Sequence, residues 1–127
     1  FNLAETSEMQ MMKTGALISC AAISGGIAGG ADDQLLAAQA AYAKHLGLAF
    51  QIADDLLDYD GDSTVLGKPA GQDAVRGKAG FVALMGGDAA AAEAKRLIDE
   101  ANNALAPWQG AGKYMQDLAV FAITRKT

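Results

Sequence analysis

The feature of this sequence that most constrains its fold is a stripe of mostly apolar side chains that leads into a cluster of aspartates. The members of this stripe recur every three or four residues: Leu35, Gln39, Tyr42, Leu46, Ala49, Ala53 and Leu57. This spacing places side chains on one face of an α-helix. It predicts a long helix that is capped by Asp32 or Asp33, reaches about Tyr59 and is ended by Gly61.

The rest of the chain favours helices too, so the sequence predicts an all-α fold. Alanine is abundant, there are only two prolines, and β-branched or aromatic runs are few. We expect further helices over residues 4–29 (which Thr6 or Ser7 could cap if the helix begins there), 73–85 (capped by Asp73), 88–104 and from 113 onward. The short connections between these stretches predict a bundle of antiparallel helices.

Two of these helices carry apolar side chains that we expect to face the interior. On the first helix they are Met9, Met12, Ala16, Ile23 and Ile27, with Cys20 between Ala16 and Ile23. On the last helix they are Tyr114, Leu118, Phe121 and Ala122. The methionines are more typical of core packing than of cofactor binding, because methionine fills irregular gaps.

Charge and cysteine content narrow the class of protein. The net charge of −5 argues against a nucleic-acid partner. The single cysteine, Cys20, excludes an internal disulfide and fits a reducing compartment. The uncharged run from Thr14 to Ala31 is nearly long enough to cross a bilayer, but its five glycines and two serines favour a packed internal helix. We therefore expect a cytoplasmic protein without a membrane span.

Three aspartates at the end of the apolar stripe form a candidate metal site. Asp54, Asp55 and Asp58 stand at i, i+1 and i+4, so a helix would project their carboxylates within one sector, one turn after Gln51. Like charges at this spacing repel, and the helix dipole disfavours anions near a C-terminal end. A bound cation is therefore expected. Mg²⁺, with Mn²⁺ as the alternative, suits carboxylates combined with substrate phosphates and waters.

Two lysines further along the chain suggest what else is bound. Lys68 and Lys78 can offer positive charge to the same phosphates, which predicts a diphosphate held between Mg²⁺ and ammonium groups. The alternative that the acids only solvate a helix end stays open. A calcium loop starting at Asp58 fails, because glycine falls at its fourth position and Pro69 at its twelfth. His45 has no partner at ligand spacing, so we expect it to be packed or at the surface.

Five short motifs, in this order, resemble the trans-prenyltransferase family of polyprenyl (isoprenyl) diphosphate synthases. They are KTGAL at 13–17, GLAFQIADDLLD at 47–58, LGKPAGQD at 66–73, GK at 77–78, and a basic tail. Within that family the chain is similar to bacterial farnesyl diphosphate synthases. The resemblance implies the all-α isoprenoid-synthase fold, of which residues 1–127 would form the C-terminal half of a single domain. The family's first aspartate-rich motif is not found before Lys13, so we expect a segment of a longer synthase that is inactive alone.

The resemblance also implies roles for individual residues. The second aspartate-rich motif of the family, which engages Mg²⁺ on the allylic diphosphate, is matched by Asp54, Asp55 and Asp58, with Asp54 as the chief ligand. Lysines that bind diphosphate are matched by Lys13, Lys68 and Lys78. Residues beside the developing allylic cation are matched by Thr14 and Gln51, and a residue beside the isopentenyl diphosphate site is matched by Phe50.

The reaction implied is the Mg²⁺-dependent condensation of an allylic diphosphate with isopentenyl diphosphate in isoprenoid biosynthesis, by ionisation, condensation and elimination. Farnesyl diphosphate is the expected product and a homodimer the expected assembly. A non-catalytic regulatory subunit of a prenyl synthase is the alternative, although such a subunit has no need for the aspartate and lysine patch. A terpene cyclase is a further alternative, but the lysines and the KTG and GKPAGQD motifs resemble chain synthases. The roles of Cys20 and of the Arg125–Lys126 tail stay open.

Overall fold

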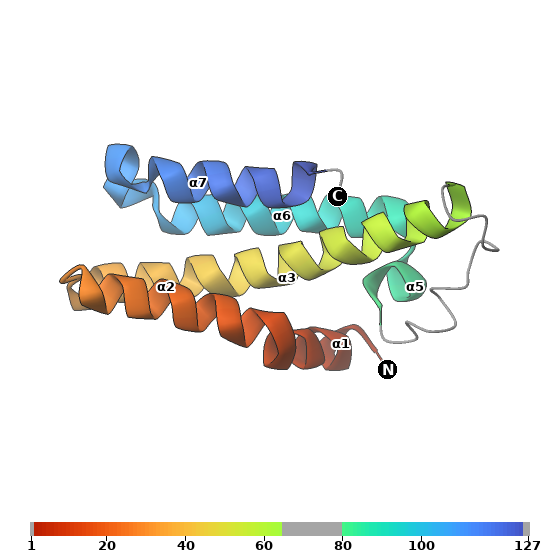
Figure 1. Ribbon diagram of the computed structural model, residues 1–127, viewed down its shortest axis with the longest axis horizontal. Coiled ribbons are helices and arrows are strands. Elements are labelled where there is room, and N and C mark those ends of the chain that lie inside the picture. Colours follow the sequence, from red (N-terminus) through yellow and green to blue (C-terminus); the bar gives the residue numbers. More distant parts are fainter. Residues whose placement is uncertain (1, 65–79, 126–127) are drawn as a thin grey trace.

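The computed structural model describes residues 2–64 and 80–125, and within these ranges every regular element is a helix. In chain order they are α1 (Leu3–Gln10), a kinked turn (Met11–Gly15), α2 (Ala16–Ala28), α3 (Asp33–Thr64), α5 (Phe81–Met85), α6 (Gly87–Ala104), a 3₁₀ turn (Ala106–Trp108) and α7 (Gln109–Thr124). Figure 1 shows α3 running the length of the molecule, with α1 and α2 along one side and α6 and α7 along the other. The predicted all-α fold is confirmed.

Most of the core lies where α3 packs against α6. The buried side chains of this interface are Tyr42, Leu46, Ala49 and Ile52 from α3 and Ala90, Ala94, Leu97, Ile98 and Ala101 from α6. The alanines of α6 let the two helices approach closely, because short side chains reduce the distance between packed helices. On α3 the other stripe members are buried (Ala53) or half-buried (Leu35, Gln39 and Leu57), which confirms the predicted apolar face.

The two ends of α3 behave differently from each other. At its start, Asp32 Oδ1 accepts a hydrogen bond from the backbone N–H of Leu35 at 2.8 Å, which confirms the predicted cap. At its other end the helix continues to Thr64, so the prediction that Gly61 ends it is wrong. A glycine inside a helix costs about 1 kcal/mol relative to alanine, and that cost does not by itself stop a long helix.

The helix α1 is capped by Asn2, which was not among the predicted caps. Asn2 Oδ1 accepts the N–H of Glu5, and Glu5 Oε2 accepts the N–H of Asn2, both at 2.9 Å. This reciprocal pair is a capping box, in which two otherwise unsatisfied donors at the helix start are paired. The predicted caps at Thr6 and Ser7 are therefore wrong, and Thr6 is fully buried instead.

The helical segment before α6 is shorter than predicted. Gly80 is extended, with φ −74° and ψ 150°, and α5 begins only after it, at Phe81. A continuous helix over 73–85 is therefore wrong at Gly80, while Asp73 and residues 74–79 lie outside the described residues. Gly86 has φ +86°, a conformation that glycine adopts without strain, and it separates α5 from α6 as expected.

The predicted inward face of the N-terminal helices is correct only in part. Met9 and Ile23 are half-buried, whereas Met12 and Ile27 are 77% and 64% exposed and Ala16 and Cys20 are exposed as well. The side that meets α3 carries Gly26, which is buried, and Ile18, which is half-buried. Apolar side chains occur around the whole circumference of this segment, so their spacing did not reveal which side would be buried.

The last helix shows the same error. Tyr114, Leu118 and Phe121 were expected to face the interior but are 89%, 55% and 61% exposed. The side of α7 that is buried carries Ala119 and Ala122, of which Ala122 was predicted. Small side chains let α7 lie close to α3 and α6, which leaves its larger apolar side chains uncovered.

One stretch of the described chain, Leu3–Ala28, is long and apolar enough to cross a membrane by length and composition alone. Of its most apolar window 12% is buried in the structure. The expectation of a well-packed internal helix is therefore met only on the side that contacts α3.

Candidate functional site

Lys13 and Thr14 lie at a break in the N-terminal helical run. Residues Met11–Gly15 form a kinked turn between α1 and α2, in which Lys13 has φ −91° and ψ −112°, outside the helical region. The predicted single helix over 4–29 is therefore wrong at this point. The turn packs against α3, with Thr14 half-buried and Lys13 exposed. This kinked turn carries two of the predicted site residues, Lys13 and Thr14.

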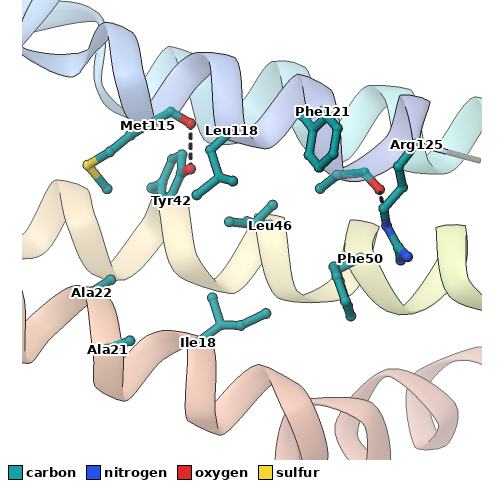
Figure 2. Close-up of a pocket in the computed structure, with 11 residues that line it drawn as sticks. Ile18, Ala21, Ala22, Tyr42, Leu46, Phe50, Met115, Leu118, Phe121 and Arg125 are labelled. Carbon is teal, nitrogen blue, oxygen red and sulfur yellow. Dashed lines mark hydrogen bonds between the residues drawn. The ribbon is translucent and has the colours of Figure 1, made fainter. Parts of the chain in front are cut away.

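Three further predicted residues, Phe50, Gln51 and Asp54, lie on neighbouring turns of α3, opposite the end of α7. Arg125, which follows α7, reaches across to two of them. Its guanidinium carbon lies 4.5 Å from the centre of the Phe50 ring, and its Nη2 lies 3.8 Å from Asp54 Oδ1. Its Nε donates a hydrogen bond to the carbonyl oxygen of Ala122 at 3.1 Å, as Figure 2 shows. Arg125 therefore joins the end of α7 to the aspartate-bearing part of α3.

The exposed fractions of Arg125 and Asp54 show which of the two side chains can bind a further ligand. The side chain of Arg125 is 15% exposed, whereas that of Asp54 is 51% exposed. The Arg125 side chain is thus held between the helices, while the Asp54 carboxylate keeps a side open to solvent. A guanidinium stacked on an aromatic ring contributes about 0.5–2 kcal/mol, and an exposed ion pair at most about 1 kcal/mol.

The carboxylate of Asp55 has a different partner from that of Asp54. Its Oδ2 accepts a hydrogen bond from the backbone N–H of Val82 at 2.8 Å, at the start of α5. The side chain is half-buried. Asp54 and Asp55 are adjacent in sequence and therefore about 100° apart around the helix, which is why one meets Arg125 and the other meets α5.

Asp58 is exposed and stands one turn after Asp54. In the part of the chain that the structure describes, no three acidic, histidine or cysteine side chains come together closely enough to hold a metal ion. The pair Asp54 and Asp58 nevertheless has suitable donor chemistry, because Mg²⁺ uses one or two protein carboxylates and completes its shell with waters and phosphates. The three-aspartate metal site stays a prediction.

An apolar groove of about 480 Å³ lies between α2, α3 and α7, next to this charged region. Figure 2 shows the side chains that line it: Ile18, Ala21, Ala22, Tyr42, Leu46, Phe50, Met115, Leu118, Phe121, Ala122 and Arg125. Arg125 is the one charged side chain among these lining residues, and it lies at the same end as Phe50. The groove therefore offers an apolar surface with a positive charge at one end.

Tyr42 lines this groove and links two of the helices that form it. Its hydroxyl donates a hydrogen bond to the carbonyl oxygen of Met115 at 2.5 Å, which ties α3 to α7. Burial raises the pKa of Tyr42 to about 12, because a buried phenolate would lose its hydration. The phenol therefore stays protonated and remains a donor throughout the physiological range.

His45, one turn from Tyr42, is half-buried. Burial is the largest influence on it and lowers its pKa. Its Nδ1 is buried and has no hydrogen-bond partner among the described residues. The expectation of a packed or surface histidine therefore agrees with its position.

Some predicted residues are not placed, and some contacts were not predicted. Lys68 and Lys78 lie outside the described residues. The contact of Arg125 with Phe50 and Asp54 was not predicted, and the only sequence signal for it is a basic residue at the end of an apolar helix. The bond from Val82 to Asp55 was not predicted either, and its only signal is a glycine, Gly80, where a capping side chain would otherwise stand.

The sequence is similar to known proteins of one kind. A family model described as polyprenyl synthetase matches residues 1–109. A protein from Fischerella ambigua named dimethylallyltranstransferase is 38% identical over 124 residues, which is 98% of this chain and 36% of that protein. Farnesyl diphosphate synthase of Escherichia coli is 44% identical over 94 residues, which is 73% of this chain and 31% of that protein.

A solved structure agrees with these sequence relatives. The apo structure of a synthase from Zymomonas mobilis, titled as an FPP/GFPP synthase, superposes with a TM-score of 0.78 at 33% sequence identity. The match covers 96% of this chain and 39% of that one. The chain thus spans between about three and four tenths of the length of these relatives.

Proposed function

Since the chain belongs to the polyprenyl synthetase family, we propose that it supplies the diphosphate-binding part of a trans-prenyltransferase active site. The proposed reaction joins an allylic diphosphate to isopentenyl diphosphate and yields a longer isoprenyl diphosphate. Farnesyl diphosphate is the proposed product, a choice supported by the name of the Escherichia coli relative. The synthase and transferase names of the relatives support a catalytic role over a regulatory subunit.

One observation carries the proposal: a charged region adjoins an apolar groove. Phe50 lines the groove, Asp54 stands one turn later on the same helix, and Arg125 contacts both. Prenyl diphosphates combine an anionic head with a hydrocarbon tail and need both kinds of surface. The apolar wall stabilises the tail by about 25 cal/mol per Å² of surface removed from water, while cations stabilise the head.

The chain's own residues have distinct parts in the proposed reaction. The bond between the allylic carbon and the diphosphate oxygen breaks, the double bond of isopentenyl diphosphate attacks the resulting cation, and a proton leaves. Lys13, exposed at the helix break, holds diphosphate oxygens through charge-assisted hydrogen bonds. Thr14 and Gln51, both half-buried, present neutral oxygen dipoles to the cation and offer it no strong nucleophile.

The acidic residues complete the site. Asp54 and Asp58 would hold Mg²⁺ or Mn²⁺ together with waters and diphosphate oxygens. When bound, the ion would stabilise the negative charge that develops on the departing diphosphate. Asp54 is the first choice of ligand because its carboxylate is half-exposed and so can be reached from solvent.

Further parts of the proposal rest on the sequence. Lys68 and Lys78 are proposed as additional diphosphate ligands from the motifs that contain them. Homodimer formation is proposed because α2 and α7 expose large apolar side chains, including Leu17, Ile27 and Phe121, that a partner surface would cover. The cytoplasm is proposed as the compartment because the sequence has a single cysteine, Cys20, and so no internal disulfide.

The substitution Asp54→Asn in the complete gene product tests the proposal. We expect the rate of condensation of isopentenyl diphosphate with geranyl diphosphate to fall at least about a hundredfold, as is usual when a group that stabilises transition-state charge is lost. The matched control is Asp99→Asn, which removes an exposed carboxylate from α6 and should leave the rate near wild type.

Two results would count against the proposal. A near-wild-type rate for Asp54→Asn would remove the metal role of Asp54. A folded wild-type protein that makes no product from isopentenyl diphosphate with either dimethylallyl or geranyl diphosphate would point to the regulatory subunit.

A further inference from the structure

The helix α5 begins without a capping side chain of its own. Its N-cap residue is Gly80, which has no side chain, and its first turn contains no acidic residue. The first backbone N–H groups of a helix have no partner within the helix and need an acceptor from elsewhere. Because Gly80, Phe81 and Val82 are all buried, water is a poor substitute for that acceptor.

Asp55 of α3 supplies the missing acceptor. Its Oδ2 accepts the N–H of Val82 at 2.8 Å, across 27 residues of sequence. Val82 is the second residue of the helix, which is one of the two positions that an N-cap side chain normally serves. The negative charge of a carboxylate at this position also matches the positive end of the helix dipole. Asp55 thus caps a helix that is remote in sequence.

The neighbouring aspartate has the opposite surroundings. The Asp54 side chain is 51% exposed and lies 3.8 Å from the guanidinium of Arg125. Its carboxylate can accept a ligand from solvent without giving up a bond to a buried backbone group. Asp55 could bind a ligand with the same oxygen only by leaving the N–H of Val82 unpaired in a partly buried place.

We propose that Asp55 is a positioning residue that fixes α5 against the turn of α3 bearing Asp54, and that it is not a metal ligand. The proposal rests on the proposed function for the role of Asp54. The two adjacent aspartates then have different roles: Asp54 binds the metal and diphosphate, and Asp55 holds the start of α5 beside it. The cap thereby joins the start of α5 to the turn of α3 that bears Asp54.

Two substitutions at Asp55 separate the two roles. Asp55→Asn keeps a side-chain oxygen that can accept the N–H of Val82, because asparagine caps helices about as well as aspartate. The same change removes the charge that a metal ligand needs. Asp55→Ala removes both the acceptor and the charge. Asp54→Asn serves as the matched control, since it makes the same chemical change at the adjacent residue.

Two measurements read out the two roles. Hydrogen exchange of the Val82 amide reports the cap, with amides of the α3–α6 core as a check on global folding. We expect exchange at Val82 to accelerate about 2- to 30-fold in Asp55→Ala, the range that corresponds to losing a helix cap, and to stay near wild type in Asp55→Asn. Electron paramagnetic resonance of Mn²⁺ with inorganic diphosphate reports the metal, and we expect Asp54→Asn to weaken binding far more than Asp55→Asn.

Each outcome decides one question. Unchanged Val82 exchange in Asp55→Ala overturns the cap, and so does equal acceleration in Asp55→Asn. Loss of Mn²⁺ binding in Asp55→Asn as large as in Asp54→Asn makes Asp55 a ligand and overturns the proposal. If Asp54→Asn leaves Mn²⁺ binding intact, the proposed function fails at Asp54, while the exchange of Val82 still decides what Asp55 does.

Discussion

Gly25 and Gly26 are neighbours on α2, and the same substitution should stabilise the protein more at Gly25 than at Gly26. A Cβ atom built at Gly26 would lie 2.0 Å from Gln39 Oε1 and 2.9 Å from Leu36 Cδ2, both on α3. A Cβ atom built at Gly25 would have no neighbour within 4 Å among the described residues. The two positions therefore differ in whether the helix surface at that point is pressed against another helix.

The magnitudes follow from these distances. Gly25→Ala gains up to about 1 kcal/mol, because alanine loses less backbone entropy than glycine on forming a helix. Gly26→Ala has the same gain, but the ends of the Gln39 and Leu36 side chains must move away, and because both ends are flexible the cost lies near the lower limit of the about 1–3 kcal/mol that overpacking causes. We expect the free energy of unfolding of the two variants to differ by about 1 kcal/mol, with Gly25→Ala the more stable.

Urea unfolding followed by circular dichroism measures the difference directly. Both variants should unfold with the m-value of the wild type, so that a change in midpoint reports a change in stability. Gly26→Leu extends the series and should lower the midpoint further, because its side chain cannot fit between the helices. If Gly26→Ala raised the midpoint as much as Gly25→Ala, α2 would not pack this closely on α3.

Three further predictions concern the groove and its charged end. Burial raises the pKa of Tyr42 to about 12. Between about pH 10 and 12 the unfolded chain therefore releases a proton that the folded chain keeps, and the free energy of unfolding should fall by up to about 3 kcal/mol as the pH rises. Tyr42→Phe should lack this part of the fall, and an identical pH profile would contradict the assignment. Arg125→Gln removes a positive charge 3.8 Å from Asp54. The loss of this charge should tighten Mn²⁺ binding by up to about fivefold at low salt. Weaker Mn²⁺ binding would instead show that Arg125 helps to hold the bound ion. Phe121→Ser should reduce concentration-dependent self-association in sedimentation velocity, because Phe121 is 61% exposed; unchanged association would exclude this face of α7 as the contact.

The face of the central helix could be predicted from sequence, whereas the faces of its neighbours could not. Along α3, polar and charged residues interrupt the apolar ones on all sides but one. The spacing of the apolar residues therefore indicated a single buried face. Along α2 and α7, apolar residues occur on every side. The structure buries Gly26, Ala119 and Ala122 there and leaves Ile27 and Phe121 outside. Close helix approach favoured the small side chains, and this preference depends on the shape of the partner helix.

The candidate site divides in the same way. The sequence indicated Asp54 and Asp58 through chemical type and spacing along one helix, and Lys13 and Gln51 through the resemblance to polyprenyl diphosphate synthases. It did not indicate that the helix would break at Lys13, because no proline or capping signal marks the interruption. It placed both Asp54 and Asp55 in the metal site, with Asp54 as the chief ligand, and the structure gives the two carboxylates different partners.

By itself, then, the sequence determined the all-α class, the buried face of α3, the Asp32 cap and the family. These depend on local spacing and on motifs, which are properties of contiguous residues. Only the tertiary structure decided which sides of α2 and α7 are buried, that Asp55 caps α5, and that Arg125 lies between Phe50 and Asp54. The last two of these contacts join residues from 27 to 75 positions apart. Their geometry is set when the helices pack together, and no local pattern contains it.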